Sequence, residues 1–293
     1  MTPTITIDGG ATRGRARLHD ACDCVTVRLD EPLSLTTVGL SDVLRRLDHL
    51  LRMLPVQAEV TGILAGLAGA VTAAQTEPVI AFLRERHPRA HVSVVTDLDL
   101  VLAHLTGPGA ALIVGTGAIV AARGEQGREV LVDGRGFAIG DRGSGGWIAL
   151  EALRRSIKDY DLRETESALL RALRTELGVA EGLQMARALA EGGGPGARRV
   201  AALAPVVLRL ADCGDRDAGA ILDDAVAEII ASVEAALRRA GCYERAEVVV
   251  TGGVVAHPGF LRRLADALAS HGKLGRLRRV DPLEAGHLIG RTR

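Results

Sequence analysis

Four apolar stretches of the chain end in loops of small residues that carry an Asp or a Thr. The loops are Asp8-Gly9-Gly10-Ala11-Thr12, Thr96-Asp97, Gly115-Thr116-Gly117 and Thr251-Gly252-Gly253. Ligand sites in α/β sheets lie at the carboxyl ends of strands, where such loops are expected. Glycine lets backbone N–H groups approach a ligand closely, and rows of these groups form a nest for an anion. The pattern therefore favours an α/β protein that binds phosphate groups.

The order of the expected elements indicates two lobes built in the same way. Short consecutive strands, typical of antiparallel hairpins, are expected between residues 4 and 27, and strand–helix units follow from residue 59. Hairpins return at 110–132, and a last strand–helix unit begins at residue 247. Hairpins followed by strand–helix units, occurring twice, suggest a duplicated lobe.

The length of the chain agrees with two lobes. A chain of 293 residues is long for a single core and can hold two lobes of roughly 100–150 residues each. We expect residues 1–114 to form an N-terminal lobe together with a C-terminal helix at about 282–293. Residues 115–281 are then expected to form a C-terminal lobe, with a helical insertion at about 147–245.

The expected insertion reads as almost pure helix. Asp217 and Gly241 are expected to cap the two ends of its longest helix, because Asp favours the N-cap and Gly the C-terminal end. The insertion is also a candidate surface for a homodimer.

Composition and charge exclude several classes of function. The formal net charge is zero and aromatic residues make up 2% of the chain, so no nucleic acid partner is expected. The chain lacks the pattern of a signal peptide and an apolar run of about 18–20 residues, so we expect no membrane and a cytoplasmic protein. Cys22, Cys24, Cys213 and Cys242 are too few and too irregular for a disulfide framework. Together with His19, the first two match no zinc spacing.

Other phosphate-binding designs do not match the chain. A P-loop requires Gly-Lys-Ser/Thr, which does not occur in the sequence. The dinucleotide fingerprint fails because Val120 stands where a third glycine should follow Gly115 and Gly117. The strand lysine and the catalytic loop of protein kinases do not occur either. What remains is a fold that holds phosphates with hairpin glycines and supplies carboxylates instead of a lysine.

Several segments, in order and over essentially the whole chain, resemble the BadF/BadG/BcrA/BcrD-type ATPase family. They are Ile7–Arg13 (first phosphate loop), Val95-Thr96-Asp97, Ile113–Ala118 (second phosphate loop), Gly140–Ile148, Thr251–Val254 (adenosine loop) and, loosely, Pro282–Leu288. The stretch Gly140–Ile148 is the most distinctive, since it resembles the family's GDEGSGxWI signature. The family includes N-acetylglucosamine and glucosamine kinases and lies within the sugar kinase/Hsp70/actin superfamily.

This resemblance implies a fold and a reaction. The fold is an α/β, two-lobed, actin-like ATPase fold (ribonuclease H-like) with a helical insertion in the second lobe. The cofactors are ATP and magnesium (Mg²⁺). The reaction is phosphorylation of an amino sugar of the N-acetylglucosamine or glucosamine type, with an Asp as general base, and N-acetylmuramic acid is a further candidate substrate.

The resemblance also implies roles for individual residues. Asp97 corresponds to the catalytic base, and Asp8 would hold magnesium through water. The residues implied to bind ATP are Gly9, Gly10, Ala11, Thr12, Gly115, Thr116, Gly117, Gly252 and Gly253. The residues implied to bind the substrate are Asp97, Thr116, Asp141, Ser144 and Trp147.

The chain departs from the family pattern at four positions of these segments. Thr96 replaces the usual Asn, Ala118 the usual Ser, Arg142 the usual Glu, and Gly146 a common aromatic residue. Arg142 reverses the charge beside Asp141, so its surroundings bear on substrate binding and turnover.

Alternative interpretations stay open at this point. One is a redox ATPase that activates a 2-hydroxyacyl-CoA dehydratase, the other branch of the family, which holds an iron–sulfur cluster through cysteines. Another is a non-catalytic regulator that binds a nucleotide or a sugar. For single residues, Asp97 is alternatively a helix cap, Asp141 a turn-stabilising residue and Trp147 a core residue.

Overall fold

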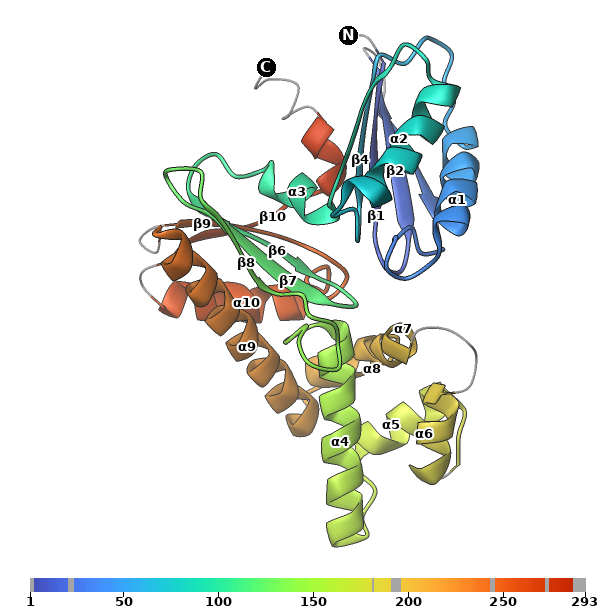
Figure 1. Ribbon diagram of the computed structural model, residues 1–293. Helices are drawn as coiled ribbons and strands as arrows, with labels where there is room; N and C mark the ends of the chain where they lie inside the picture. Colours follow the sequence, from blue (N-terminus) through green and yellow to red (C-terminus); the bar gives the residue numbers. More distant parts are fainter. Residues whose placement is uncertain are drawn as a thin grey trace. The chain divides into compact units, whose positions relative to one another are not determined.

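The chain forms two compact units in the computed structural model (Figure 1). The structure describes residues 3–20, 24–180, 182–190, 196–242, 246–271 and 274–286. The first unit comprises Met1–Thr106 and Val280–Arg293, and the second comprises Gly107–Arg279. The chain therefore passes twice between the units. The expected boundary after residue 114 lies too late, because the strand Gly109–Val114 pairs with strands of the second unit.

The first unit contains a mixed five-stranded sheet with the order β3-β2-β1-β4-β5. Strands β1 and β2, and β2 and β3, pair antiparallel, whereas β4 and β5 continue the sheet parallel to β1. The strands are β1 (Thr4–Gly9), β2 (Gly14–His19), β3 (Cys24–Leu29), β4 (Gly62–Leu67) and β5 (His91–Val95). The helices are α1 (Leu40–Arg52), α2 (Ala73–Arg86), α3 (Asp97–Leu102) and the short 3₁₀ helix η1 (Pro282–Glu284).

The two faces of β1 and β2 differ in character. Ile5 and Ile7 alternate with polar residues along β1, and with α1 and α2 they form one buried apolar core. The opposite face carries Thr6 and Asp8 from β1, together with their cross-strand partners from β2. The segment around η1 lies against β1 and β2. Of the expected C-terminal helix at about 282–293, residues 287–293 lie outside the described part of the chain.

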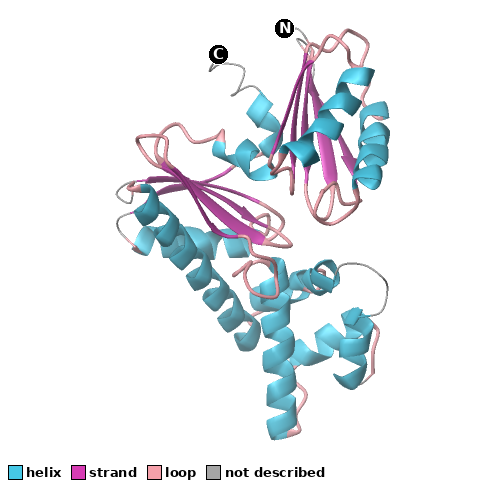
Figure 2. Ribbon diagram, in the orientation of Figure 1, coloured by secondary structure: helices cyan, strands magenta, loops and turns pink. Residues whose placement is uncertain are grey.

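The second unit also contains a sheet, whose strands Figure 2 draws in magenta like those of the first unit, and it repeats the strand arrangement. Its sheet has the order β8-β7-β6-β9-β10, again with two antiparallel pairs followed by two parallel strands. The strands are β6 (Gly109–Val114), β7 (Ala118–Arg123), β8 (Glu129–Asp133), β9 (Ala246–Thr251) and β10 (Leu274–Arg279). The same order in both sheets confirms the predicted pair of related lobes, although no sequence repeat is visible.

Helices fill the chain between β8 and β9. They are α4 (Gly145–Arg163), α5 (Ala168–Leu177), α6 (Gly182–Ala190), α7 (Gly196–Ala201), α8 (Ala204–Asp212) and α9 (Arg216–Ala240), and α10 (Pro258–Ser270) follows β9. The long helix α9 packs on β6, β7 and β8. Its N-cap is Asp215, not Asp217, because the Asp215 carboxylate accepts the Ala218 N–H at 2.9 Å. Gly241 ends the helix as expected, with φ of 77°.

No helix in the described ranges is long and apolar enough to cross a membrane.

Candidate active site

The first predicted phosphate loop is a tight turn between β1 and β2. The Gly10 N–H donates to the Arg13 carbonyl at 3.0 Å, and the Gly10 carbonyl accepts the Leu33 N–H at 3.0 Å. At Gly9, a Cβ atom would overlap the carbonyl oxygen of Leu33 and lie 2.5 Å from Cδ2 of Leu67. Glycine is therefore required at Gly9 by close packing rather than by a positive φ. The turn presents Ala11 and Thr12 at its tip, where both are half-buried.

Asp8 lies at the end of β1, paired with Arg15 directly across the hairpin. Nη2 and Nε of Arg15 donate to Oδ2 of Asp8 at 2.6 and 3.2 Å. Burial raises the pKa of Asp8, and the Arg15 guanidinium only partly opposes this shift. Since both hydrogen bonds end on Oδ2, the other carboxylate oxygen is left for a ligand.

Asp97 is the first residue of α3, directly after β5. The helix cap is Thr96, whose Oγ1 accepts the Asp99 N–H at 3.2 Å, while Asp99 reaches back to the Thr96 N–H at 2.8 Å. The alternative role of Asp97 as the helix cap is thus wrong, because this reciprocal pair performs the capping. Oδ1 of Asp97 accepts the adjacent Leu98 N–H, at 3.1 Å.

The carboxyl group of Asp97 has an unusual proton affinity. Burial, followed by the negative charge of Asp8, raises the pKa of Asp97 to about 7. This interaction with Asp8 agrees with their positions, since β1 and β5 run parallel in one sheet and both residues lie at its carboxyl edge. A carboxylate with a pKa near neutrality suits a general base.

In the second unit, three predicted loops are joined by backbone hydrogen bonds. The Gly115 carbonyl accepts the Gly145 N–H at 2.8 Å, and the Thr116 carbonyl accepts the Gly146 N–H at 3.1 Å. These bonds connect the second phosphate loop, Gly115-Thr116-Gly117, to the start of α4. The Val114 carbonyl accepts the Val254 N–H at 3.1 Å, which adds the adenosine loop to the cluster.

Gly252 in the adenosine loop requires glycine for two reasons. Its φ is 121°, a value that other residues rarely adopt. A Cβ atom here would also overlap the Val114 carbonyl. The following Gly253 is exposed and adjoins Gly115, since its N lies 3.7 Å from the position of a Cβ built on Gly115.

The loop from β8 to α4 is organised by Asp133, which the sequence analysis did not single out. Its carboxylate accepts the Asp141 N–H at 2.7 Å and the Arg142 N–H at 2.9 Å. Asp133 and Asp141 both have positive φ, 65° and 54°, which costs energy in residues other than glycine. The Asp133 side chain is 3% exposed, so these bonds replace water around a buried carboxylate. The signal available in the sequence was an Asp before Gly134, a common turn pattern.

Asp141 lies against the second phosphate loop. A Cβ atom on Gly117 would lie 2.6 Å from Oδ2 of Asp141, and Oδ1 accepts the Gly136 N–H at 3.2 Å. Burial raises the pKa of Asp141, with opposing hydrogen bonds from the Gly136 and Ala118 backbone. The carboxylate therefore has a turn-stabilising role, and its contact with substrate remains a prediction.

Arg142 pairs with acidic residues. Its Nε donates to Oδ2 of Asp133 at 3.2 Å and lies 3.8 Å from Glu228 on α9. Two carboxylates near the guanidinium thus offset the charge reversal at this position. The side chain is partly exposed, so the ion pair with Glu228 contributes little to stability.

Ser144 and Trp147 stand at the start of α4. Ser144 is fully buried, and its hydroxyl accepts the Trp147 N–H at 3.1 Å as the helix N-cap. Trp147 is partly buried and packs against the core of the second unit. These contacts are structural, and the predicted contacts of both residues with a substrate stay predictions.

The carboxylates of the first unit fit a magnesium ion that is bound mainly by phosphate. In the described part of the chain, no group of three or more His, Cys, Asp or Glu residues is placed to hold a metal ion. Magnesium is commonly held by one or two carboxylates together with phosphate oxygens and water, so a full protein cage is not needed. Asp8, with Asp97 near it, provides such a partial site.

The described cysteines are all free thiols. Cys24 and Cys213 are exposed, whereas Cys242 is buried and donates to the Arg123 carbonyl. Each lies outside the predicted phosphate and adenosine loops. Cys22, considered with His19 and Cys24 for a zinc site, lies outside the described residues.

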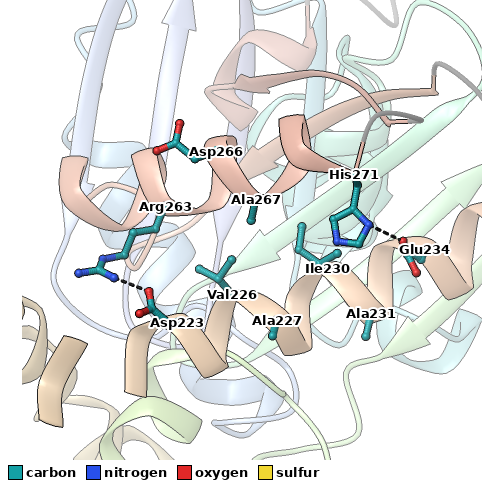
Figure 3. A pocket seen from close by; sticks show the side chains of 10 residues that line it. All are labelled: Asp223, Val226, Ala227, Ile230, Ala231, Glu234, Arg263, Asp266, Ala267 and His271. Atoms are coloured by element: carbon teal, nitrogen blue, oxygen red, sulfur yellow. Dashed lines mark hydrogen bonds and ion pairs between the residues drawn. The ribbon is translucent and has the colours of Figure 1, made fainter. Parts of the chain in front are cut away.

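A groove of about 510 Å³ lies between α9 and α10 (Figure 3). Its floor includes Val226 and Ile230 of α9 and Ala267 of α10. A polar pair spans it at each side: Arg263 forms an ion pair with Asp223, and Nδ1 of His271 lies 2.9 Å from Oε1 of Glu234. The groove contains none of the predicted site residues.

The two sheets of identical strand order, each with a glycine-containing loop after its first strand, define a two-lobed ATPase of the actin-like fold. The family model of the BadF/BadG/BcrA/BcrD ATPase family matches residues 5–277, and the chain belongs to this family. Membership implies the use of ATP. The predicted family and fold class are thereby confirmed.

Individual proteins that resemble the chain are named as sugar kinases. The chain is 25% identical over 270 residues to the N-acetylmuramic acid/N-acetylglucosamine kinase of Clostridium acetobutylicum. The aligned residues cover 89% of this chain and 88% of the relative. It is 29% identical over 169 residues to a glucosamine kinase of Vibrio cholerae, over 55% of this chain and 56% of the relative. A solved structure assigned as an N-acetylglucosamine kinase from Chromobacterium violaceum superposes with a TM-score of 0.76 at 25% identity, covering 99% of this chain and 98% of its own.

Proposed function

We propose that the protein is an ATP-dependent kinase that transfers the γ-phosphoryl group of ATP to a hydroxyl of an amino sugar. The substrate class is N-acetylglucosamine, glucosamine or N-acetylmuramic acid, which the names of the two curated relatives support. The observation that carries the proposal is Asp97: a carboxyl group at a strand end, released from capping by Thr96 and Asp99, with a pKa of about 7.

In this proposal the phosphates of ATP bind to backbone N–H groups of the two glycine loops. The first unit would supply Gly9, Gly10, Ala11 and Thr12. The second unit would supply Gly115, Thr116 and Gly117. Gly252 and Gly253 would lie against the adenosine. When bound, magnesium would neutralise charge on the phosphate oxygens, and Asp8 is the carboxylate that would hold it through water.

Asp97 would accept the proton from the sugar hydroxyl as the hydroxyl oxygen attacks the γ-phosphorus. A new oxygen–phosphorus bond forms, and the bond between the γ-phosphorus and the bridging oxygen breaks. That oxygen keeps the electron pair and leaves with ADP. Asp97 then releases its proton to solvent. Because such transfer depends mainly on positioning, the fixed backbone around Asp97 is a direct contribution to rate.

The sugar would be bound through Asp97, Thr116, Asp141, Ser144 and Trp147. Carboxylates and hydroxyls suit a polyol, because they pair with its hydroxyl groups at defined angles. The Asp141 carboxylate accepts backbone hydrogen bonds from Gly136 and Ala118, so it would meet the sugar in one fixed orientation.

The test is ADP release with ATP, magnesium and each of the three amino sugars, together with detection of the sugar phosphate by mass spectrometry. We expect a phosphorylated product from at least one of them. Binding of ATP without product from any of the three would contradict the kinase proposal and favour a regulator. Asp30→Asn, at an exposed Asp of the first unit, is the matched control for changes at Asp97.

A further inference from the structure

The polar face of β1 and β2 is covered by the segment Val280–Gly286. His19 on β2 lies with Nε2 at 3.1 Å from both the Leu283 carbonyl and Oγ1 of Thr6 on β1. At Gly286, a Cβ atom would overlap Oγ1 of Thr6. The segment therefore packs closely against the strand that ends in Asp8.

Asp281 is the charged residue of this segment. Its Oδ1 lies 3.1 Å from Nη1 of Arg15, and its Oδ2 accepts from Nη2 of Arg17 at 2.7 Å. Burial alone would raise the pKa of Asp281, but Arg15, the Leu283 N–H and Arg17 together lower it. Asp281 is consequently ionised at neutral pH.

Arg15 is shared between two carboxylates. Nε and Nη2 bind Asp8, while Nη1 binds Asp281. A guanidinium is planar and rigid, so its nitrogens keep fixed directions relative to one another, and contacts at several of them together orient the group. Both contacts with Asp8 end on the single atom Oδ2, so the third contact, from Nη1 to Asp281, limits rotation of the guanidinium about that oxygen.

We propose that Asp281 is a positioning residue for the magnesium–nucleotide site. It orients Arg15 so that Arg15 occupies Oδ2 of Asp8 and leaves Oδ1 facing the ligand. The inference rests on the proposed function, in which Asp8 serves the metal.

A purely structural role would look different. If Asp281 only pinned the C-terminal segment to the sheet, removing Arg17 should have the same consequences, because Arg17 also holds Asp281 and makes no contact with Asp8. Arg17→Gln is therefore the matched control for Asp281→Asn. Both variants lose an ion pair of the same cluster, and both should lower the melting temperature.

The experiment is isothermal calorimetry of ADP binding across a magnesium titration, which does not require turnover. We expect Asp281→Asn to raise the magnesium concentration for half-maximal ADP affinity by about 10-fold, as is typical for partners of metal-binding carboxylates. Arg17→Gln should shift it by less than about twofold. Arg15→Lys should reproduce the Asp281→Asn shift, because an ammonium cannot bind both carboxylates in the same fixed geometry.

Equal magnesium dependence in Asp281→Asn and Arg17→Gln would overturn the inference. A magnesium dependence like that of the wild type in Arg15→Lys would also overturn it, and this variant tests the inference even if Asp281→Asn does not fold. ADP binding by the wild type that does not depend on magnesium would overturn it as well. The expected shifts without any sugar phosphorylation would leave the inference standing and refute the kinase proposal. Sugar phosphorylation without the shifts would support the kinase proposal and overturn the inference about Asp281.

Discussion

Oδ2 of Asp99 accepts hydrogen bonds from both the hydroxyl and the backbone N–H of Thr96, at 2.7 and 2.8 Å. This pair closes the first turn of α3 and leaves the carboxylate between them in sequence, Asp97, free of the capping task. The residue proposed as the base is therefore held by a rigid turn whose capping hydrogen bonds do not use its side chain. Rigid support of this kind is what keeps a reactive group at one position.

Replacing the proposed base should separate binding from turnover. Asp97→Asn keeps the size of the side chain and its bond to the Leu98 N–H but cannot accept a proton at neutral pH. We expect kcat to fall by about 10²–10⁴-fold, while the affinity for ADP changes little. Steady-state kinetics and calorimetry measure the two quantities. A kcat within a few-fold of that of Asp30→Asn would show that Asp97 is not the base.

The raised pKa of Asp97 predicts opposite effects of pH on activity and on stability. Activity requires the carboxylate, so kcat/KM should fall about tenfold per unit as the pH drops below about 7. Folding favours the protonated form, because the folded pKa lies above the unfolded value. The stabilising contribution is thus complete below pH 3.8 and is lost as the pH rises to about 7. Asp97→Asn should accordingly melt higher than wild type at pH 8. A lower melting temperature of this variant at pH 8 would contradict the burial argument.

The capping pair of Thr96 and Asp99 leads to a separate prediction for substitutions at Thr96. Thr96→Ala removes the N-cap oxygen and one donor to Asp99, which should lower the free energy of unfolding by about 1 kcal/mol. Thr96→Asn, which restores the residue usual in the family, should cost less than about 0.5 kcal/mol because Asn caps as well as Thr. Urea denaturation of both variants provides the measurement. Equal losses in both would mean that the threonine methyl group, not the cap, is what stabilises the turn.

The places of several candidate site residues in the fold could be predicted because their signals are local. A strand followed by small residues is visible within a few positions, and Gly9, Asp97 and Gly252 lie at strand or helix ends as expected. The assignment of β6 to the second unit could not be predicted in this way, since it depends on hydrogen bonds to β9, more than a hundred residues later. The same holds for the pair of Arg17 and Asp281, which are 264 positions apart.

The helix cap at Asp215 shows a different limit. Both Asp215 and Asp217 are good caps by residue type, and the choice between them depends on where the preceding helix α8 ends. The Asp133 network fails for a related reason. Its three nitrogen donors come from residues eight and nine positions later, across a loop whose conformation is not encoded in any simple spacing.

Gly252 offers a test of the adenosine loop. Gly252→Ala would place a methyl group against the Val114 carbonyl at a φ of 121°, and we expect a loss of about 1–3 kcal/mol in the free energy of unfolding. ADP affinity should fall as well, because the loop must move. Gly127→Ala is the matched control, since Gly127 also has a positive φ, 73°, but faces open space. If both variants lose the same stability and ADP binds unchanged, the contact with Val114 is unimportant.

Arg142 stands where the resembled family pattern has Glu, and its contacts predict which change at this position matters. Arg142→Gln keeps the backbone N–H that Asp133 accepts and removes only the side-chain pairs, so the KM for the sugar should change by less than about threefold. Arg142→Glu instead brings a third carboxylate to Asp133 and Glu228, and like charges at this distance repel. The turn that carries Asp141 should then shift, raising the KM for the sugar by about 10-fold with little change in the KM for ATP. Steady-state kinetics with each substrate varied in turn measures both constants. An Arg142→Glu variant with improved sugar KM would show instead that the arginine weakens the site, and that the family's glutamate is compatible with the Asp133 network.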